Sequence, residues 1–67
     1  MVDVNYVNGL IAKSHIKLTA LAQAMGFSRQ TLYSKMKGEV EFKPPEIDKL
    51  CIILRLTDEE KSHIYTT

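Results

Sequence analysis

Polar side chains of the types that read DNA bases cluster between residues 28 and 37. Arg29 and Gln30 directly follow Ser28, whose hydroxyl is a favoured helix N-cap. In the major groove of B-form DNA, arginine pairs with guanine O6 and N7, and glutamine pairs with adenine N6 and N7. Two such side chains in the first turn of a helix therefore predict contacts with base edges.

The other polar residues of this segment suit contacts beside the bases. We expect Leu32 and Met36, one turn apart, to face the core, which leaves Tyr33, Ser34 and Lys37 on or beside the outer face. Tyrosine could stack on a sugar or touch a thymine methyl, serine could bond a base or a phosphate, and lysine suits phosphates. The candidate DNA-binding residues are Lys17, Ser28, Arg29, Gln30, Thr31, Tyr33, Ser34, Lys35, Lys37 and Lys43.

Helical periodicity and capping signals place these residues in an all-α fold of five short helices. They predict helices over about residues 3–13, 17–25, 28–37 and 58–65. A further helix is expected to begin at Pro44-Pro45, and its apolar stripe extends to Leu54. Residues 39–42 alternate polar and apolar, but a lone strand has nothing to pair with, so we expect an extended loop there. The tight turn Gly26-Phe27-Ser28 predicts a helix-turn-helix whose second member enters the groove.

Length and composition indicate one domain over residues 1–67, stabilised by apolar burial. The single cysteine, Cys51, cannot form an internal disulfide, and His15 and His63 have no third ligand nearby in the sequence, so we expect no metal and no cofactor. A helical chain this short has little room for a catalytic pocket, so we expect no enzyme. The chain shows no secretion signal and no membrane span, which predicts a cytoplasmic protein.

The charges are unevenly distributed along the chain, whose net charge is +1. Residues 1–38 hold five Lys or Arg against one Asp, whereas residues 39–67 hold four Lys or Arg against seven Asp or Glu. The first half could therefore face an anionic partner, although such asymmetry also arises by chance in a small chain.

The helix-turn-helix segment also resembles a known family. It is similar to the signature of lambda repressor-like, Cro and CI DNA-binding domains at Leu21-Ala22, Gly26-Phe27-Ser28-Arg29, Leu32, Met36 and Gly38. The continuation from Val40 to Glu60 resembles small Cro-like regulators of temperate phages of Gram-positive bacteria, among them the modulators of repression of lactococcal phages.

The resemblance implies a fold, a partner and a biological setting. The fold would be the five-helix lambda repressor-like domain, with base contacts by Arg29, Gln30 and Ser34 to double-stranded operator DNA. The setting would be a lysis/lysogeny switch in the bacterial host cytoplasm, where the chain opposes or modulates a CI-type phage repressor.

Two departures from the family pattern leave a second function open. Many relatives begin the second helix with a glutamine that bonds a phosphate, whereas Leu18 stands here. The modest basicity also offers few phosphate partners, and nonspecific DNA affinity depends on their number. The alternative is an anti-repressor that acts mainly by binding the CI-type repressor and has weak DNA affinity of its own.

The apolar residues near the C-terminus exceed what one face of the last two helices needs. If some are exposed, they would form a homodimer or partner surface, and if all are buried they belong to the core. The residues concerned are Ile52, Ile53, Leu56, Ile64 and Tyr65. For the acidic run Asp58-Glu59-Glu60 we expect capping of the last helix and compensation of its dipole, with a partner site as the alternative.

Overall fold

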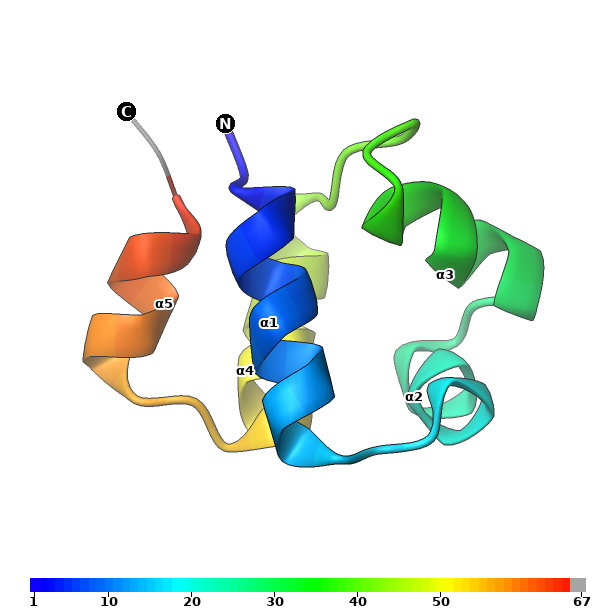
Figure 1. Cartoon of the computed structure of the whole chain (residues 1–67), viewed down its shortest axis with the longest axis horizontal. Helices are drawn as coiled ribbons and strands as arrows, with labels where there is room; N and C mark the ends of the chain where they lie inside the picture. Colours follow the sequence, from blue (N-terminus) through cyan, green and yellow to red (C-terminus); the bar gives the residue numbers. More distant parts are fainter. Residues whose placement is uncertain (66–67) are drawn as a thin grey trace.

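The computed structural model, which describes residues 1–65, consists of five α-helices (Figure 1). They are α1 (Val4–Ser14), α2 (Leu18–Met25), α3 (Arg29–Met36), α4 (Pro44–Leu54) and α5 (Asp58–Ile64). The all-α prediction is confirmed, and the expected bounds differ from the observed ones by at most one residue. Residues 39–42 form an irregular connection, and the one β contact among the described residues is an isolated antiparallel bridge between Val2 and Tyr65.

Side-chain caps determine where α1 and α5 begin. Asp3 Oδ1 accepts a hydrogen bond from Tyr6 N–H at 3.1 Å. Thr57 N–H donates to Glu60 Oε1 at 2.9 Å, and Glu60 N–H donates to Thr57 Oγ1 at 3.1 Å. The bond from Thr57 N–H is also the main reason why the pKa of Glu60 is lowered. A cap of this kind stabilises a helix by about 1 kcal/mol.

The core lies between α1 and α4, which run side by side through the centre of the bundle (Figure 1). Helix α5 packs on one side of this pair, and α2 with α3 packs on the other. Every helix and the loop before α4 contribute buried apolar side chains, at Val7, Leu10, Ile11, Leu21, Ala22, Met25, Leu32, Phe42, Ile47, Leu50 and Ile64. Because full burial of a leucine or isoleucine contributes about 1.5–3 kcal/mol, this cluster is the main stabilising term of the fold.

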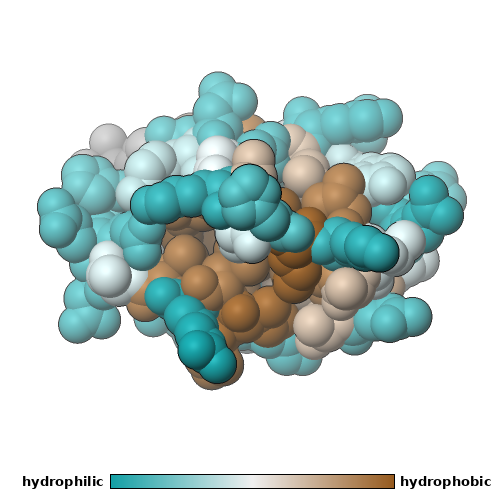
Figure 2. All heavy atoms as spheres, turned by 60° about the horizontal axis from the view of Figure 1, so that its bottom comes forward, coloured by the Kyte–Doolittle hydropathy of each residue, from teal (hydrophilic) through white to brown (hydrophobic). Residues whose placement is uncertain are grey.

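The apolar residues near the C-terminus divide between core and surface. Ile64 is fully buried, whereas Ile53, Leu56 and Tyr65 pack half-buried against the core. Ile52 on α4 is 78 % exposed. Figure 2 shows other hydrophobic side chains reaching the surface on the face formed by the α1–α2 connection and the end of α4. Of the five residues in question, Ile52 is therefore the one that a partner could reach fully.

Lys35 is the one charged residue of α3 that the structure buries. Its side chain lies with Nζ 5.3 Å from the centre of the Phe27 ring and 5.9 Å from that of Phe42, and the residue is 5 % exposed. Nζ donates to Glu46 Oε1 at 3.0 Å and to the Glu41 carbonyl oxygen at 3.4 Å. The prediction that Lys35 contacts phosphate is therefore wrong, because its ammonium is enclosed and bonded within the fold.

Glu46 receives two donors on the same carboxylate oxygen. Oε1 accepts from Lys43 N–H at 2.8 Å, at the start of α4, and from Lys35 Nζ at 3.0 Å. Partial burial by itself would raise the pKa of Glu46, but the Lys43 N–H and then the Lys35 ammonium outweigh this effect, and the pKa is lowered. The ionised carboxylate therefore holds the start of α4 and the end of α3 together.

Loss of the Lys35 ammonium should destabilise the domain more than loss of an exposed lysine next to it. The variant Lys35→Met removes both hydrogen bonds and leaves Glu46 without its cation, so we expect the free energy of unfolding to fall by about 1.5–3 kcal/mol. Lys37→Met, which changes an exposed side chain, should alter it by less than about 0.5 kcal/mol. Urea unfolding followed by circular dichroism measures both values. Equal effects of the two variants would contradict this role of Lys35.

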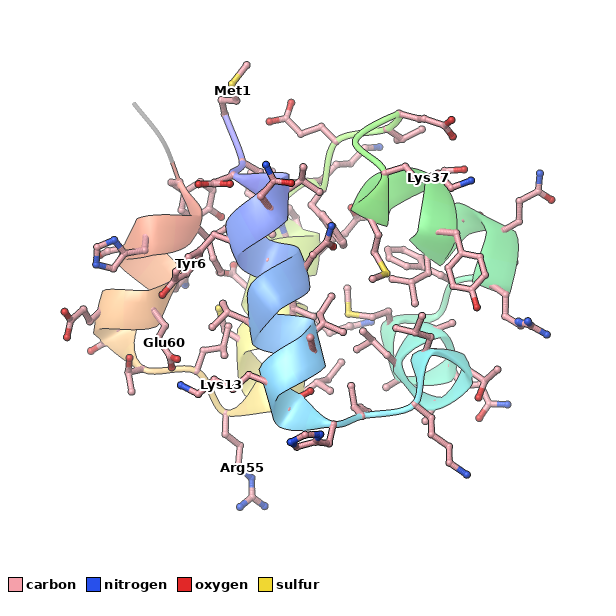
Figure 3. All side chains as sticks on the ribbon, in the orientation of Figure 1. Met1, Tyr6, Lys13, Lys37, Arg55 and Glu60 are labelled. Carbon is pink, nitrogen blue, oxygen red and sulfur yellow. The ribbon has the colours of Figure 1, made fainter. Side chains whose placement is uncertain are left out.

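Helices α1 and α4 each end on a non-glycine residue in the left-handed conformation. His15 has φ 59° and Arg55 has φ 54°. Arg55 N–H bonds to the Ile52 carbonyl at 3.3 Å, while the Arg55 side chain projects away from the bundle (Figure 3). An L residue with a Cβ atom is strained in this region, so both positions carry a conformational cost.

Glycine at position 55 should relieve this strain. We expect Arg55→Gly to raise the free energy of unfolding by about 1 kcal/mol, since glycine adopts positive φ freely. The matched control is Lys49→Gly, an exposed position inside α4, where glycine should lower it by about 1 kcal/mol. Denaturant midpoints of the two variants test the expectation, and a loss of stability in Arg55→Gly would count against it.

Candidate nucleic-acid interface

Helices α2 and α3 are joined by the predicted tight turn. Gly26 ends α2 with φ +78°, which lets its N–H reach the Gln23 carbonyl at 3.1 Å while Phe27 N–H reaches the Ala22 carbonyl at 2.8 Å. Ser28 then caps α3, since its Oγ accepts from Thr31 N–H at 3.1 Å. The two helices and their turn form a helix-turn-helix, as the sequence predicted.

The buried face of α3 fixes which of its side chains point outward. Leu32 is fully buried and Met36 is half-buried against the core, as the one-turn spacing predicted. Asn8 of α1 holds the other end of the helix, because its Nδ2 donates to the Met36 carbonyl at 2.8 Å. The end of α3 is therefore tied to α1 through Asn8, whereas its start is held locally by the Ser28 cap.

The outward side chains of α3 line one open hollow, which we call the α3 hollow. Arg29 and Gln30 are exposed in the first turn, and Tyr33 and Ser34 are half-buried. Lys37 is exposed at the C-terminal end of the helix (Figure 3). The residues that line the hollow are Arg29, Gln30, Tyr33, Ser34, Lys37 and Glu39. Hydrogen-bond donors of several kinds thus lie together on one short helix.

Two contacts hold the side chains at the start of α3 in place. The Arg29 guanidinium lies 6.0 Å from the centre of the Tyr33 ring, one helical turn further on, which is within the range of a cation–π contact. The hydroxyls of Ser28 and Thr31 are bonded to each other at 2.9 Å. Ser28 therefore serves the cap of α3 in this structure, and its availability to DNA stays a prediction, as does that of Thr31.

The remaining predicted lysines lie apart from the α3 hollow. Lys17 precedes α2, is exposed, and lines a separate hollow with Ile16 and Leu18. Lys43 precedes α4, is exposed, and lines another hollow with Val2 and Tyr65. Their roles as phosphate contacts stay predictions, and the structure groups neither of them with Arg29 and Gln30.

Leu18 has a structural role at the start of α2. It is half-buried and packs against the core cluster. The departure from the family pattern at this position therefore replaces a polar side chain with one that contributes to packing.

Two residues of this region were missed by reasoning from the sequence. Asn8 is a polar residue within the apolar spacing of α1, and that interruption was the signal for its contact with α3; its Oδ1 atom is buried without a hydrogen-bond partner. Glu39 directly follows Gly38 and lines the α3 hollow. The signal in the sequence was an acidic residue directly after a segment, residues 28–37, whose charged residues are all basic.

Residues 1–65 give little support for a metal site, a reactive cysteine or a membrane-spanning helix. This part of the chain contains no group of three or more His, Cys, Asp and Glu residues that could hold a metal ion. Cys51 is half-buried, and burial raises the pKa of its thiol, which disfavours the reactive thiolate. No helix among these residues is long and apolar enough to cross a membrane.

Comparison with known proteins agrees with this geometry. The family model described as Cro/C1-type HTH DNA-binding domain matches residues 7–60, a range that runs from within α1 into α5 and contains the whole helix-turn-helix. No curated protein and no solved structure matches the chain significantly. Since the family model covers most of its length, the chain belongs to the Cro/C1-type HTH DNA-binding domain family.

Proposed function

We propose that this chain is a transcriptional regulator of a temperate phage that binds operator DNA with α3 in the major groove. It would act in the cytoplasm of the bacterial host, in a lysis/lysogeny switch that opposes or modulates a CI-type repressor. The observation that carries the DNA-binding part is the α3 hollow, in which Arg29, Gln30, Tyr33, Ser34 and Lys37 face solvent together. The phage setting rests on the resemblance of residues 40–60 to small Cro-like regulators.

The dimensions of α3 suit the groove. Its eight residues span about 12 Å, and an α-helix with its side chains fits the major groove of B-form DNA. In the proposed complex Arg29 reads guanine and Gln30 reads adenine, because the first turn of such a helix meets the base edges. Tyr33 and Ser34 contact the adjoining sugar, thymine methyl or phosphate, and Lys37 binds a phosphate at the other end.

The affinity of a single domain for DNA should be modest. The burial of Lys35 leaves Lys17, Lys37 and Lys43 as the proposed phosphate lysines. Each phosphate that a protein neutralises contributes about 0.9 to the slope of log affinity against log salt concentration, so three give a weak, shallow dependence. Homodimerisation on a symmetric operator would double these contacts, and we include a homodimer in the proposal.

Substitution of Arg29 and of Lys37 should affect DNA binding in different ways. Arg29→Ala removes a base contact, so we expect a loss of about 1–3 kcal/mol on the preferred duplex and a relaxed choice of base at one position. Lys37→Ala removes a phosphate contact, so it should weaken binding to all sequences alike and reduce the salt slope by about one. Binding measured by fluorescence anisotropy, on a duplex selected from a random library and on unselected duplex, separates the two effects. If neither variant alters binding, α3 is not the reading helix.

A second candidate function is an anti-repressor that binds the CI-type repressor and contacts DNA only weakly. The small number of exposed lysines near α3 favours it, as does the largely exposed Ile52 on α4. The acidic first turn of α5 also leaves Asp58 and Glu59 exposed, which gives a cationic partner a place to bind.

The two functions differ in what the purified protein does alone. If the chain is an operator binder, we expect the purified protein alone to retard a duplex selected from a random library. An anti-repressor should bind such a duplex negligibly, but should change the footprint or the mobility of the complex between a CI-type repressor and its operator. In that case Ile52→Ser should weaken the effect while Arg29→Ala leaves it intact, and the reverse pattern would reject the anti-repressor.

A further inference from the structure

We propose that Glu39 is a negative determinant of DNA affinity, which opposes the phosphate backbone at the end of α3 and weakens binding to every sequence alike. The proposal rests on the proposed function, since it assumes that the α3 hollow faces DNA. It assigns to this acidic residue a role opposite to that of its neighbour Lys37.

The backbone at Glu39 is fixed against the last turn of α3. Gly38 turns the chain with φ +82°, and Glu39 N–H then donates to the Ser34 carbonyl at 3.0 Å. Val40 N–H approaches the same carbonyl at 3.4 Å. These bonds keep Glu39 at the rim of the α3 hollow, which it lines together with Ser34 and Lys37.

The carboxylate of Glu39 forms no ion pair with a side chain of the described residues. The ion pairs between side chains of residues 1–65 are Lys13–Glu60, Lys35–Glu46 and Lys61–Asp48, and Glu39 takes part in none of them. Lys37, two residues away, forms no ion pair with it. The residue is exposed and lines the hollow, so its carboxylate faces whatever enters it.

The position of Glu39 decides which part of a duplex it would meet. A carboxylate can only accept hydrogen bonds, so it is attracted to the amino groups of cytosine and adenine and repelled by phosphates. Base contacts come from the N-terminal residues of a groove-reading helix, whereas the far end of such a helix lies toward the backbone. Glu39 lies beyond the C-terminal end of α3, whose partial negative charge adds to its own. It therefore meets phosphates.

The test compares Glu39→Gln with Glu59→Gln and with the unchanged chain. Glu59 is an exposed carboxylate in the first turn of α5, at the opposite end of the bundle from α3 (Figure 1). Glu59→Gln therefore has the same net charge as Glu39→Gln but leaves the α3 hollow unchanged. Affinity is measured by fluorescence anisotropy at low and moderate salt. The probes are a short duplex selected from a random library and a short duplex of unselected sequence.

We expect Glu39→Gln to bind both duplexes about three- to tenfold more tightly at low salt, with the gain shrinking as salt screens the repulsion. Glu59→Gln should differ from the unchanged chain by less than about twofold. Equal affinities of the two variants, or weaker binding of Glu39→Gln to the selected duplex alone, would overturn the proposal; the second result would indicate a cytosine contact. If circular dichroism shows that all three proteins are folded and none of them binds DNA, the proposed operator-binding function is rejected as well.

Discussion

The buried ammonium of Lys35 is the constraint on which the arrangement of this domain depends. Removal of a charge from water is costly unless other groups replace the lost hydration. Here Glu46 and the Glu41 carbonyl accept its hydrogen bonds, and the faces of Phe27 and Phe42 enclose it. Since these partners come from the helix-turn-helix junction, the loop after α3 and the start of α4, one side chain holds three segments in register.

The same contact shapes the outward surface of α3. With Lys35 directed inward, Arg29 and Gln30 project from the opposite side of the helix, beside Tyr33 and Ser34. The Lys35 ammonium is therefore buried in the interior and is absent from the outward surface of α3. Of the five basic residues in the first half of the sequence, Lys35 is therefore the one whose charge is buried.

The ends of α3 are held by contacts of different range. Its start is set locally, by the left-handed Gly26 and the Ser28 cap. Its end is set by tertiary contacts, with Asn8 of α1 bonded to the Met36 carbonyl and Lys35 bonded to α4. Helix α1 therefore supports α3 directly, although it lies outside the helix-turn-helix itself.

The sequence by itself determined the helices, their caps, the tight turn and the outward position of Arg29 and Gln30. These features follow from interactions between residues at most one or two turns apart, which periodicity and residue type reveal. Only the tertiary structure decided that Lys35 is buried, that Lys43 lies apart from the α3 hollow, that Glu39 lines it and that Ile52 is exposed. The reason is that lysines on one short helix look alike in sequence, and which of them turns inward depends on an acceptor that another helix supplies, here Glu46 of α4.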